Sequence, residues 1–292
     1  MQGRRLGDLT INRVLECHTP FDPLWFFPDC TLDHWHAHSD WLVPTKAFDP
    51  ATNKIVFPIQ SYVVKTTHHT ILLDTCVGNH KSRDFLDEWN HKTDDTYLRS
   101  LAAVGLKPED IDIVMCTHLH PDHVGWNTQL QNGEWVPTFP NARYIFSAEE
   151  LKVWEQLHAK RPNQALVDSV LPIVAAGAAD LVKSDYAVDD EVWLESSPGH
   201  TPDHFCVRLA SQGHDAVVTG DMIHSPIQCL YPEWIVRPDF DKPMGAETRR
   251  SFLERYADTS TLVCTMHFPL PSVGRIESDR EAFKFVYEDS NW

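Results

Sequence analysis

The residues best suited to do chemistry lie in one short stretch, Thr-His-Leu-His-Pro-Asp-His, at residues 117–123. It places three imidazoles and one carboxylate within six positions. It directly follows an apolar run at residues 111–116, which predicts a buried strand. A loop at the end of a strand that presents several nitrogen and oxygen donors is typical of a metal site. The stretch therefore predicts metal binding, provided that the rest of the chain supplies further ligands.

Three later strand-like runs also end in histidine or aspartate. The first precedes His200 in Ser-Pro-Gly-His-Thr, the second precedes Asp221 in Thr-Gly-Asp, and the third precedes His267. Strand ends at one edge of a sheet can converge on one point, which is where α/β proteins commonly bind ligands. The chain thus offers five imidazoles and two carboxylates without a thiolate, a set that suits Zn²⁺ and also permits manganese, iron or cobalt.

In this order, the four segments resemble those of the metallo-β-lactamase-fold hydrolases, and the match covers roughly residues 59–276. The resemblance implies two divalent metal ions per chain. The first would be held by His118, His120 and His200, the second by Asp122, His123 and His267, and Asp221 would bridge them. Asp122 and Asp221 are the expected catalytic residues, with Asp122 able to receive or relay a proton. Asp74, in the family's Asp-Thr-x-x-Gly, is expected to orient the metal loop.

Strand-like runs occur in two blocks, each followed by helical patterns, with no linker between them. Many connections are too short for the helix crossovers of a Rossmann sheet. We therefore expect one α/β domain over residues 1–292 with the αββα architecture, in which two mixed β-sheets pack face to face and helices lie outside. Residues 18–58, rich in proline and aromatic side chains, are expected to form an irregular segment that covers a pocket or reaches the second subunit of a homodimer.

Periodicity and turn signals predict the individual elements. Expected strands cover residues 9–15, 59–65, 70–73, 142–146, 191–195, 204–209, 216–219, 261–265, 273–276 and 283–287. Expected helices cover residues 94–104, 164–176 and 247–257, and a further one that starts with a capping box at Ser147 and Glu150 and runs to residue 158. Residues 127–140 are expected to be a polar, turn-rich connection.

The bulk composition limits the partners. Of 292 residues, 42% are hydrophobic and 23% are charged, as in a globular protein that builds its own core. A formal net charge of −17 disfavours nucleic acid, because a surface that binds phosphates must be basic. No apolar run suits a membrane helix or a signal peptide. Seven cysteines without paired spacing favour reduced thiols, and hence the cytoplasm.

Residues around the predicted ligands could bind the substrate. Trp126 and Phe268 could form the wall of an apolar pocket, His224 could line it, and the hydroxyl of Tyr231 could hold a carbonyl group. For each of them, packing in the core is the alternative. The same choice applies to His204, for which a structural role is favoured.

The three histidines His34, His36 and His38 form an accessory metal site or a polar surface. The second interpretation is favoured, because nothing nearby completes a set of metal ligands.

The nearest resemblance within the family is to the branch that contains N-acyl-homoserine lactonases and methyl parathion hydrolase. Class B1 β-lactamases commonly carry cysteine where Asp221 stands, and flavodiiron proteins carry glutamate where His120 stands. The expected activity is therefore cleavage of a lactone or carboxylic ester of a small neutral or apolar molecule by a metal-bridging hydroxide. The alternatives are a phosphotriester or another xenobiotic ester as substrate, or a mononuclear iron persulfide dioxygenase that uses a subset of the ligands.

Overall fold

The computed structural model describes residues 3–288, which fall into two compact units. Unit 1 comprises Met1–Cys17 and Ile59–Tyr186, and unit 2 comprises His18–Pro58 and Ala187–Trp292. The chain passes between the units within strands β2 (Leu9–Phe21) and β4 (Lys54–Lys65), and again after residue 186. None of the helices within residues 3–288 is long and apolar enough to cross a membrane.

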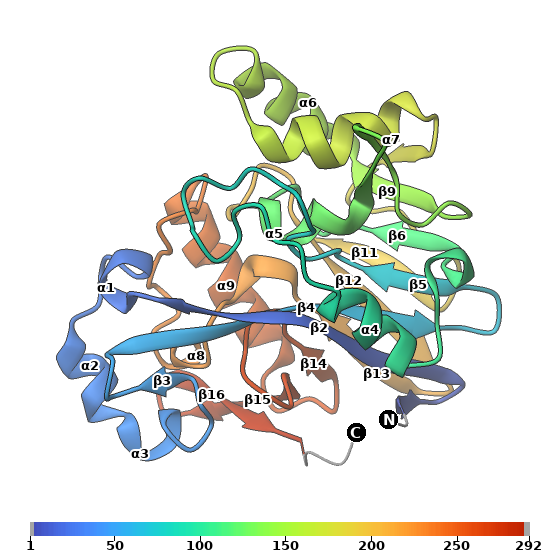
Figure 1. The fold of residues 1–292 in the computed structure, drawn as a ribbon. Helices are drawn as coiled ribbons and strands as arrows, with labels where there is room; N and C mark the ends of the chain where they lie inside the picture. Colours follow the sequence, from blue (N-terminus) through green and yellow to red (C-terminus); the bar gives the residue numbers. More distant parts are fainter. Residues whose placement is uncertain (1–2, 289–292) are drawn as a thin grey trace. The chain divides into compact units, whose positions relative to one another are not determined.

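The sheet of unit 1 is mixed, with strand order β1-β2-β4-β5-β6-β9-β10 (Figure 1). Its other strands are β1 (Arg4–Leu6), β5 (Thr70–Leu73), β6 (Ile113–Met115), β9 (Arg143–Ser147) and β10 (Ala179–Val182), and β3 (Phe48–Asp49) of unit 2 pairs with β4. Strands β5, β6 and β9 run parallel, with Leu73 beside Met115 and Met115 beside Ile145. Their carboxyl ends therefore lie at the same edge of the sheet.

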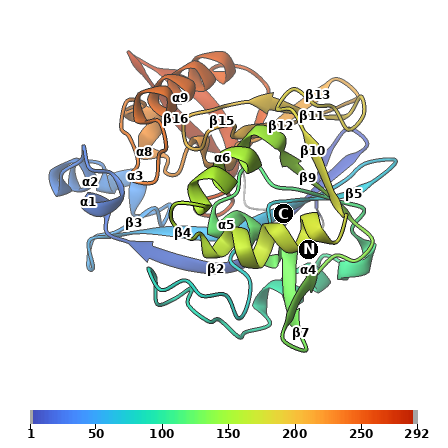
Figure 2. The same ribbon diagram turned by 90° about the horizontal axis from the view of Figure 1, so that it is seen from above.

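Short helices and one hairpin follow the strands of unit 1. The helices are α4 (Thr96–Ala103), η1 (Pro108–Asp110), α5 (Pro121–Val124), η2 (Gly125–Asn127), α6 (Ala148–His158), the π-helix η3 (Leu166–Val170) and α7 (Leu171–Ala175). The hairpin consists of β7 (Thr128–Gln131) and β8 (Glu134–Pro137). Helix α6 lies close to β9, as the view from above shows (Figure 2).

Unit 2 contains a sheet of six strands arranged in chain order from β11 to β16. They are β11 (Val192–Ser196), β12 (Phe205–Ser211), β13 (His214–Val218), β14 (Leu262–Cys264), β15 (Val273–Asp279) and β16 (Ala282–Tyr287). Only the pair β13–β14 is parallel; the other neighbours are antiparallel. Strands β11, β13 and β14 consequently run in one direction, and their carboxyl ends share an edge.

Helix α9 (Lys242–Tyr256) closes the core of unit 2. Its side chains Phe252 and Leu253 are buried together with Val217 of β13 and Val263 of β14. Burying side chains of this size stabilises the fold by about 1.5–3 kcal/mol each. The remaining helices of this unit are α1 (Pro23–Phe26), α2 (Leu32–Ala37), α3 (Ser39–Leu42), η4 (Gly220–Met222) and α8 (Ile227–Leu230).

Two large mixed sheets with helices confirm the predicted α/β class. The prediction of an irregular segment over residues 18–58 is wrong, because α1, α2, α3 and β3 form there. Proline did not prevent this: Pro23 occupies the first turn of α1, where its missing N–H costs nothing, and Asp22 accepts the N–H of Leu24 at 2.9 Å.

The expectation that residues 127–140 form only a connection is also wrong, because β7 and β8 form a hairpin there. Both turn residues of the β7–β8 hairpin, Asn132 and Gly133, have positive φ, as type I′ turns require.

Candidate metal centre

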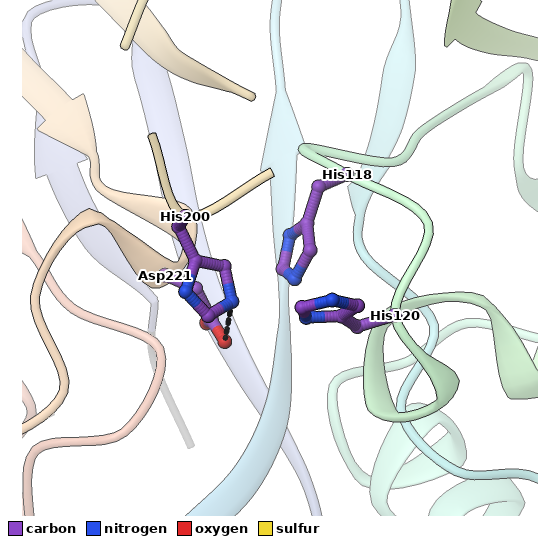
Figure 3. Close-up of side chains that lie close together, drawn as sticks. All are labelled: His118, His120, His200 and Asp221. Carbon is purple, nitrogen blue, oxygen red and sulfur yellow. Dashed lines mark ion pairs between the residues drawn. The ribbon is translucent and has the colours of Figure 1, made fainter. Parts of the chain in front are cut away.

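Unit 1 presents four of the predicted ligands on the loop that follows β6. His118 and His120 precede α5, and Asp122 and His123 lie within it, where Pro121 starts the helix. The rings of His118 and His120 lie 4.7 Å apart between centroids (Figure 3), and those of His118 and His123 lie 4.1 Å apart. The loop thus brings its imidazoles together.

Asp74, at the end of β5, holds this loop. Its carboxylate accepts hydrogen bonds from the backbone N–H and the hydroxyl of Thr117, at 2.7 and 2.9 Å, and from Nδ1 of His123 at 2.7 Å. The Thr117 hydroxyl is also 3.0 Å from Nδ1 of His118. Because β5 and β6 are parallel neighbours, the aspartate after one strand reaches the loop after the other. These contacts give Asp74 the orienting position that the sequence predicts.

Gly125 is required where the loop turns back. A Cβ atom there would lie 1.8 Å from the carbonyl oxygen of Val77, well inside van der Waals contact. The N–H of Gly125 donates to the carbonyl of Cys76 at 2.7 Å. The segment after β5 and the metal loop therefore pack backbone against backbone.

Unit 2 presents the other three ligands at the shared edge of its sheet. His200 follows β11, Asp221 follows β13 and His267 follows β14. Oδ2 of Asp221 lies 3.3 Å from Nε2 of His200, the ion pair drawn dashed in Figure 3. Oδ1 of the same carboxylate lies 2.9 Å from Nε2 of His267. Asp221 thus points one oxygen at each histidine.

Asp239, which the sequence reasoning missed, orients His200. Its Oδ1 lies 2.8 Å from Nδ1 of His200, and its Oδ2 accepts the N–H of Val236 at 2.9 Å. The buried guanidinium of Arg249 on α9 lies 3.8 Å from Oδ2. No spacing signal marks Asp239, which lies 39 positions after His200.

Burial opposes the charged form of His200, but its contacts with Asp221 and Asp239 raise the pKa of the imidazole to about 9. A positive charge is therefore favoured between these two carboxylates. When a metal ion binds there, it takes the place of that proton.

The ring nitrogens fit metal binding. In ligand histidines, one nitrogen binds the metal while the N–H of the other usually donates to an oxygen. Here Nδ1 of His118 faces Thr117, Nδ1 of His123 faces Asp74 and Nδ1 of His200 faces Asp239. Nδ1 of His267 lies 3.1 Å from the carbonyl oxygen of Pro58. In all four histidines, Nε2 is therefore the nitrogen that would bind a metal.

The seven predicted ligands fall into two groups of side chains that could each hold a metal ion. One consists of His118, His120, His200 and Asp221, and the other of Asp122, His123, Asp221 and His267. Asp221 belongs to both. Each group offers four imidazole or carboxylate donors, the number typical of a zinc site, which supports binding of two divalent ions.

The residues predicted to line a pocket have varied surroundings. Trp126 is buried, stacks on Tyr97 at 5.3 Å and donates its Nε1–H to Glu16 at 2.8 Å. Phe268 is buried in the core of unit 2, with its ring 4.9 Å from that of Phe285. Both rings serve packing, and a contact with substrate stays a prediction for them.

His224 and Tyr231 both belong to unit 2. His224 is buried, with Nε2 3.1 Å from Oδ2 of Asp221 and its ring 5.6 Å from that of His267, in parallel planes. Burial lowers the pKa of His224 to about 4, so its imidazole is neutral. The hydroxyl of Tyr231 lies 3.0 Å from Nε2 of His38 instead, and its ring stacks on Trp234.

The histidines of α2 and its end do not belong to either group of metal ligands among the described residues. Nδ1 of His34 accepts the N–H of Thr31 at 3.0 Å at the start of the helix, and the ring of His36 packs against Phe48. These roles agree with the structural interpretation of the segment.

Comparison with known proteins supports a single family. Residues 55–265 match the model of the metallo-beta-lactamase superfamily. An N-acyl homoserine lactonase from Bacillus sp is 27% identical over 203 residues, which covers 65% of this chain and 70% of that protein. The N-acyl homoserine lactonase AiiA from Bacillus thuringiensis subsp. kurstaki is 26% identical over 209 residues, covering 67% and 73%.

Solved structures agree on the fold. AidC, a dizinc quorum-quenching lactonase in complex with a product, superposes with a TM-score of 0.82 at 23% identity and covers 99% of this chain and 97% of its own. The hydrolase AbOPH of the beta lactamase superfamily superposes with a TM-score of 0.80 at 24% identity, covering 99% and 98%. Since the family match spans more than half of the sequence and includes six of the seven predicted ligands, the chain belongs to the metallo-beta-lactamase superfamily.

Proposed function

We propose that the protein is a metal-dependent hydrolase with a dinuclear zinc centre that cleaves a lactone or a carboxylic ester of a small molecule. The observation that carries the proposal is the carboxylate of Asp221. Its two oxygens face Nε2 of His200 and Nε2 of His267, which belong to different groups of candidate ligands. A carboxylate so placed suits a bridge between two ions.

The donor set favours zinc. Each group combines neutral imidazoles with carboxylates and contains no thiolate, and the cysteines nearest to the candidate ligands in the chain, Cys116 and Cys264, belong to neither group. Such sets bind Zn²⁺ well and also accept other divalent ions of the first transition row. When bound, a metal pair polarises a carbonyl oxygen and acidifies water so that a nucleophile is available at neutral pH.

The protein's own residues have three tasks in this reaction. Asp74 lies 2.7 Å from Nδ1 of His123, and Asp239 lies 2.8 Å from Nδ1 of His200. Each contact fixes its ring so that Nε2 points away from the supporting carboxylate. Asp221, which belongs to both groups, supplies a negative charge that they share. Asp122, whose side chain is partly exposed, is the carboxylate able to take up a proton and pass it to the departing oxygen.

The relatives guide the choice of substrate. Several are N-acyl homoserine lactonases, so a lactone is the first candidate, and a linear ester requires the same attack on a carbonyl carbon. The net charge of −17 favours a neutral or apolar substrate over a polyanion. A phosphotriester remains a second substrate to be tested, and we expect neither nucleic acid nor a membrane as partner.

Two further features are proposals. The cysteines are thiols, and all except Cys17 are buried, which favours a reducing compartment such as the cytoplasm. The segment His18–Pro58 is a candidate pocket cover or dimer contact within a single catalytic domain. Light scattering of the purified protein tests the dimer.

Elemental analysis and a hydrolysis screen test the function together. We expect about two zinc ions per chain and hydrolysis of lactones or aryl esters that a chelator abolishes and added Zn²⁺ restores. One iron per chain, without ester hydrolysis, would instead support a persulfide dioxygenase. Undiminished activity in Asp221→Ala or His120→Ala would refute the mechanism.

A further inference from the structure

Helix α6 begins at the edge of the sheet where the metal loop lies. Its cap residue, Ser147, ends β9, and β9 pairs in parallel with β6, the strand that leads into the loop. The hydroxyl of Ser147 accepts the N–H of Glu150 at 3.1 Å, so the sequence signal for a capped helix is genuine. The position of Glu150 in the first turn also brings its side chain to the loop.

Glu150 connects the helix to the metal loop. Its Oε1 accepts the backbone N–H of Leu119 at 3.3 Å and the indole N–H of Trp154 at 2.7 Å. Leu119 stands between the predicted ligands His118 and His120. Glu150 is 1% exposed, so its carboxylate depends on these donors for stabilisation.

Trp154 adds a second contact to the same part of the loop. It lies one helical turn after Glu150, and its ring is 5.7 Å from that of His120, edge to face at 65°. Capping a helix needs no indole at this position. The same pair of residues therefore holds both the backbone before His120 and the ring of His120 itself.

We infer that Glu150 and Trp154 are positioning residues for the metal ion of the group that contains His120. The inference rests on the proposed metal centre, but it concerns residues that belong to neither group of candidate ligands. Glu150 fixes the peptide between two ligands, and Trp154 restricts the rotation of the His120 ring. Both contacts reduce the freedom that His120 would lose on binding a metal.

Metal titration against a competing chelator tests the inference, with thermal unfolding measured in parallel. His120→Ala and His123→Ala identify the binding steps of the two ions in the wild-type titration. Glu150→Leu is expected to weaken the step that His120→Ala abolishes by about 10–100-fold, as is usual when a group supporting a ligand is lost. Trp154→Phe, which keeps a ring but removes the N–H, is expected to weaken the same step less.

Two variants serve as controls. Glu150→Gln keeps an acceptor oxygen and is expected to bind metal nearly as the wild type does. Glu149→Leu changes the exposed neighbour, whose carboxylate pairs with Lys152 on the surface, and is expected to leave both steps unchanged. If Glu150→Leu does not fold, Trp154→Phe still decides, because its side chain is only half buried.

The outcomes separate the inference from the function on which it rests. Wild-type affinity for both ions in Glu150→Leu and Trp154→Phe would overturn the inference and leave the metal centre intact. An equal loss of both ions in proportion to lost thermal stability would also overturn it, since that is the result of a merely structural role. A wild-type protein that binds no pair of ions would refute the proposed function itself.

Discussion

Asp239→Asn is the substitution for which the structure gives the clearest magnitude. The two oxygens of Asp239 accept from two donors, Nδ1 of His200 and the N–H of Val236. Asparagine offers one oxygen, so one of these buried donors faces an NH₂ group and loses its acceptor. An unsatisfied buried donor costs about 1–3 kcal/mol.

This free-energy cost should lower the affinity of the protein for the metal. If the oxygen stays with Val236, Nδ1 of His200 is no longer held and the ring must be ordered by the metal. Because about 1.4 kcal/mol corresponds to tenfold in an equilibrium constant, the metal affinity should fall by roughly 5–150-fold. Arg249 adds no further unsatisfied donor, because its guanidinium still donates to the carbonyl oxygens of Met222, Pro232 and Trp234.

Titration with Zn²⁺ in a chelator buffer measures the change, and Asp241→Asn is the matched control. Asp241 is exposed and caps α9 by accepting the N–H of Met244 at 3.1 Å, a role that asparagine fills equally well. We expect wild-type affinity in the control. Wild-type affinity in Asp239→Asn as well would refute the idea that Asp239 supports the metal through His200.

Further perturbations probe the other supports. Asp74→Ala removes the acceptor of Thr117 and His123 and should lower the affinity of the ion held by His123 by about 10–100-fold in the same titration. Gly125→Ala should destabilise the fold by about 1–3 kcal/mol or more in urea unfolding, because its Cβ would overlap the Val77 carbonyl. Burial lowers the pKa of Lys81 to about 7, while an unfolded lysine titrates near about 10.4, so the unfolded state binds more protons in that window. The free energy of unfolding of the wild type, measured relative to that of Lys81→Met, should therefore rise between these two pH values by at most about 1.4 kcal/mol per pH unit. A difference between the two proteins that does not change with pH would contradict this prediction. Finally, chelation should lower the melting temperature of the wild type, since bound metal stabilises only the folded state, and an unchanged melting temperature would argue against a structural share for the ions.

The residues of the two candidate groups could be predicted from the sequence because they follow strands within a few positions. A strand end needs only a few residues to reach the edge of its sheet, so the type of residue there and its order in the chain carry the signal. The α/β class followed from the same regularity. The role of Asp74 was predicted from its match to the family's Asp-Thr-x-x-Gly motif, and Asp74 directly follows β5, next to the strand that leads to the metal loop.

Residues that act through tertiary contacts gave no such signal. Asp239 contacts His200 from a loop, and Arg249 contacts Asp239 from α9; nothing in their spacing predicts either contact. The sequence predicted Glu150 as a capping residue of α6. Its contact with the backbone N–H of Leu119 in the metal loop depends on the pairing of β6 with β9, which the sequence does not reveal. In residues 18–58, composition suggested irregular structure, whereas packing of buried side chains such as Phe27 and Trp35 orders short helices.

The hydrogen-bond partners of the two ring nitrogens distinguish candidate ligand histidines from supporting histidines better than the spacing of histidines in the sequence does. His204 lies four positions after His200 and is fully buried, but its Nε2 accepts the backbone N–H of Asp221 at 2.9 Å. Its Nδ1 must then carry the proton, which it donates to the hydroxyl of Ser197 at 2.8 Å. A ring with both nitrogens used in this way has no lone pair for a metal, so His204 instead supports the backbone of Asp221. His224 differs again: Nε2 faces Asp221, whereas its buried Nδ1 has no hydrogen-bond partner within residues 3–288. Nδ1 of four predicted ligand histidines faces an oxygen, and this contact distinguishes them from His224; the four are His118, His123, His200 and His267.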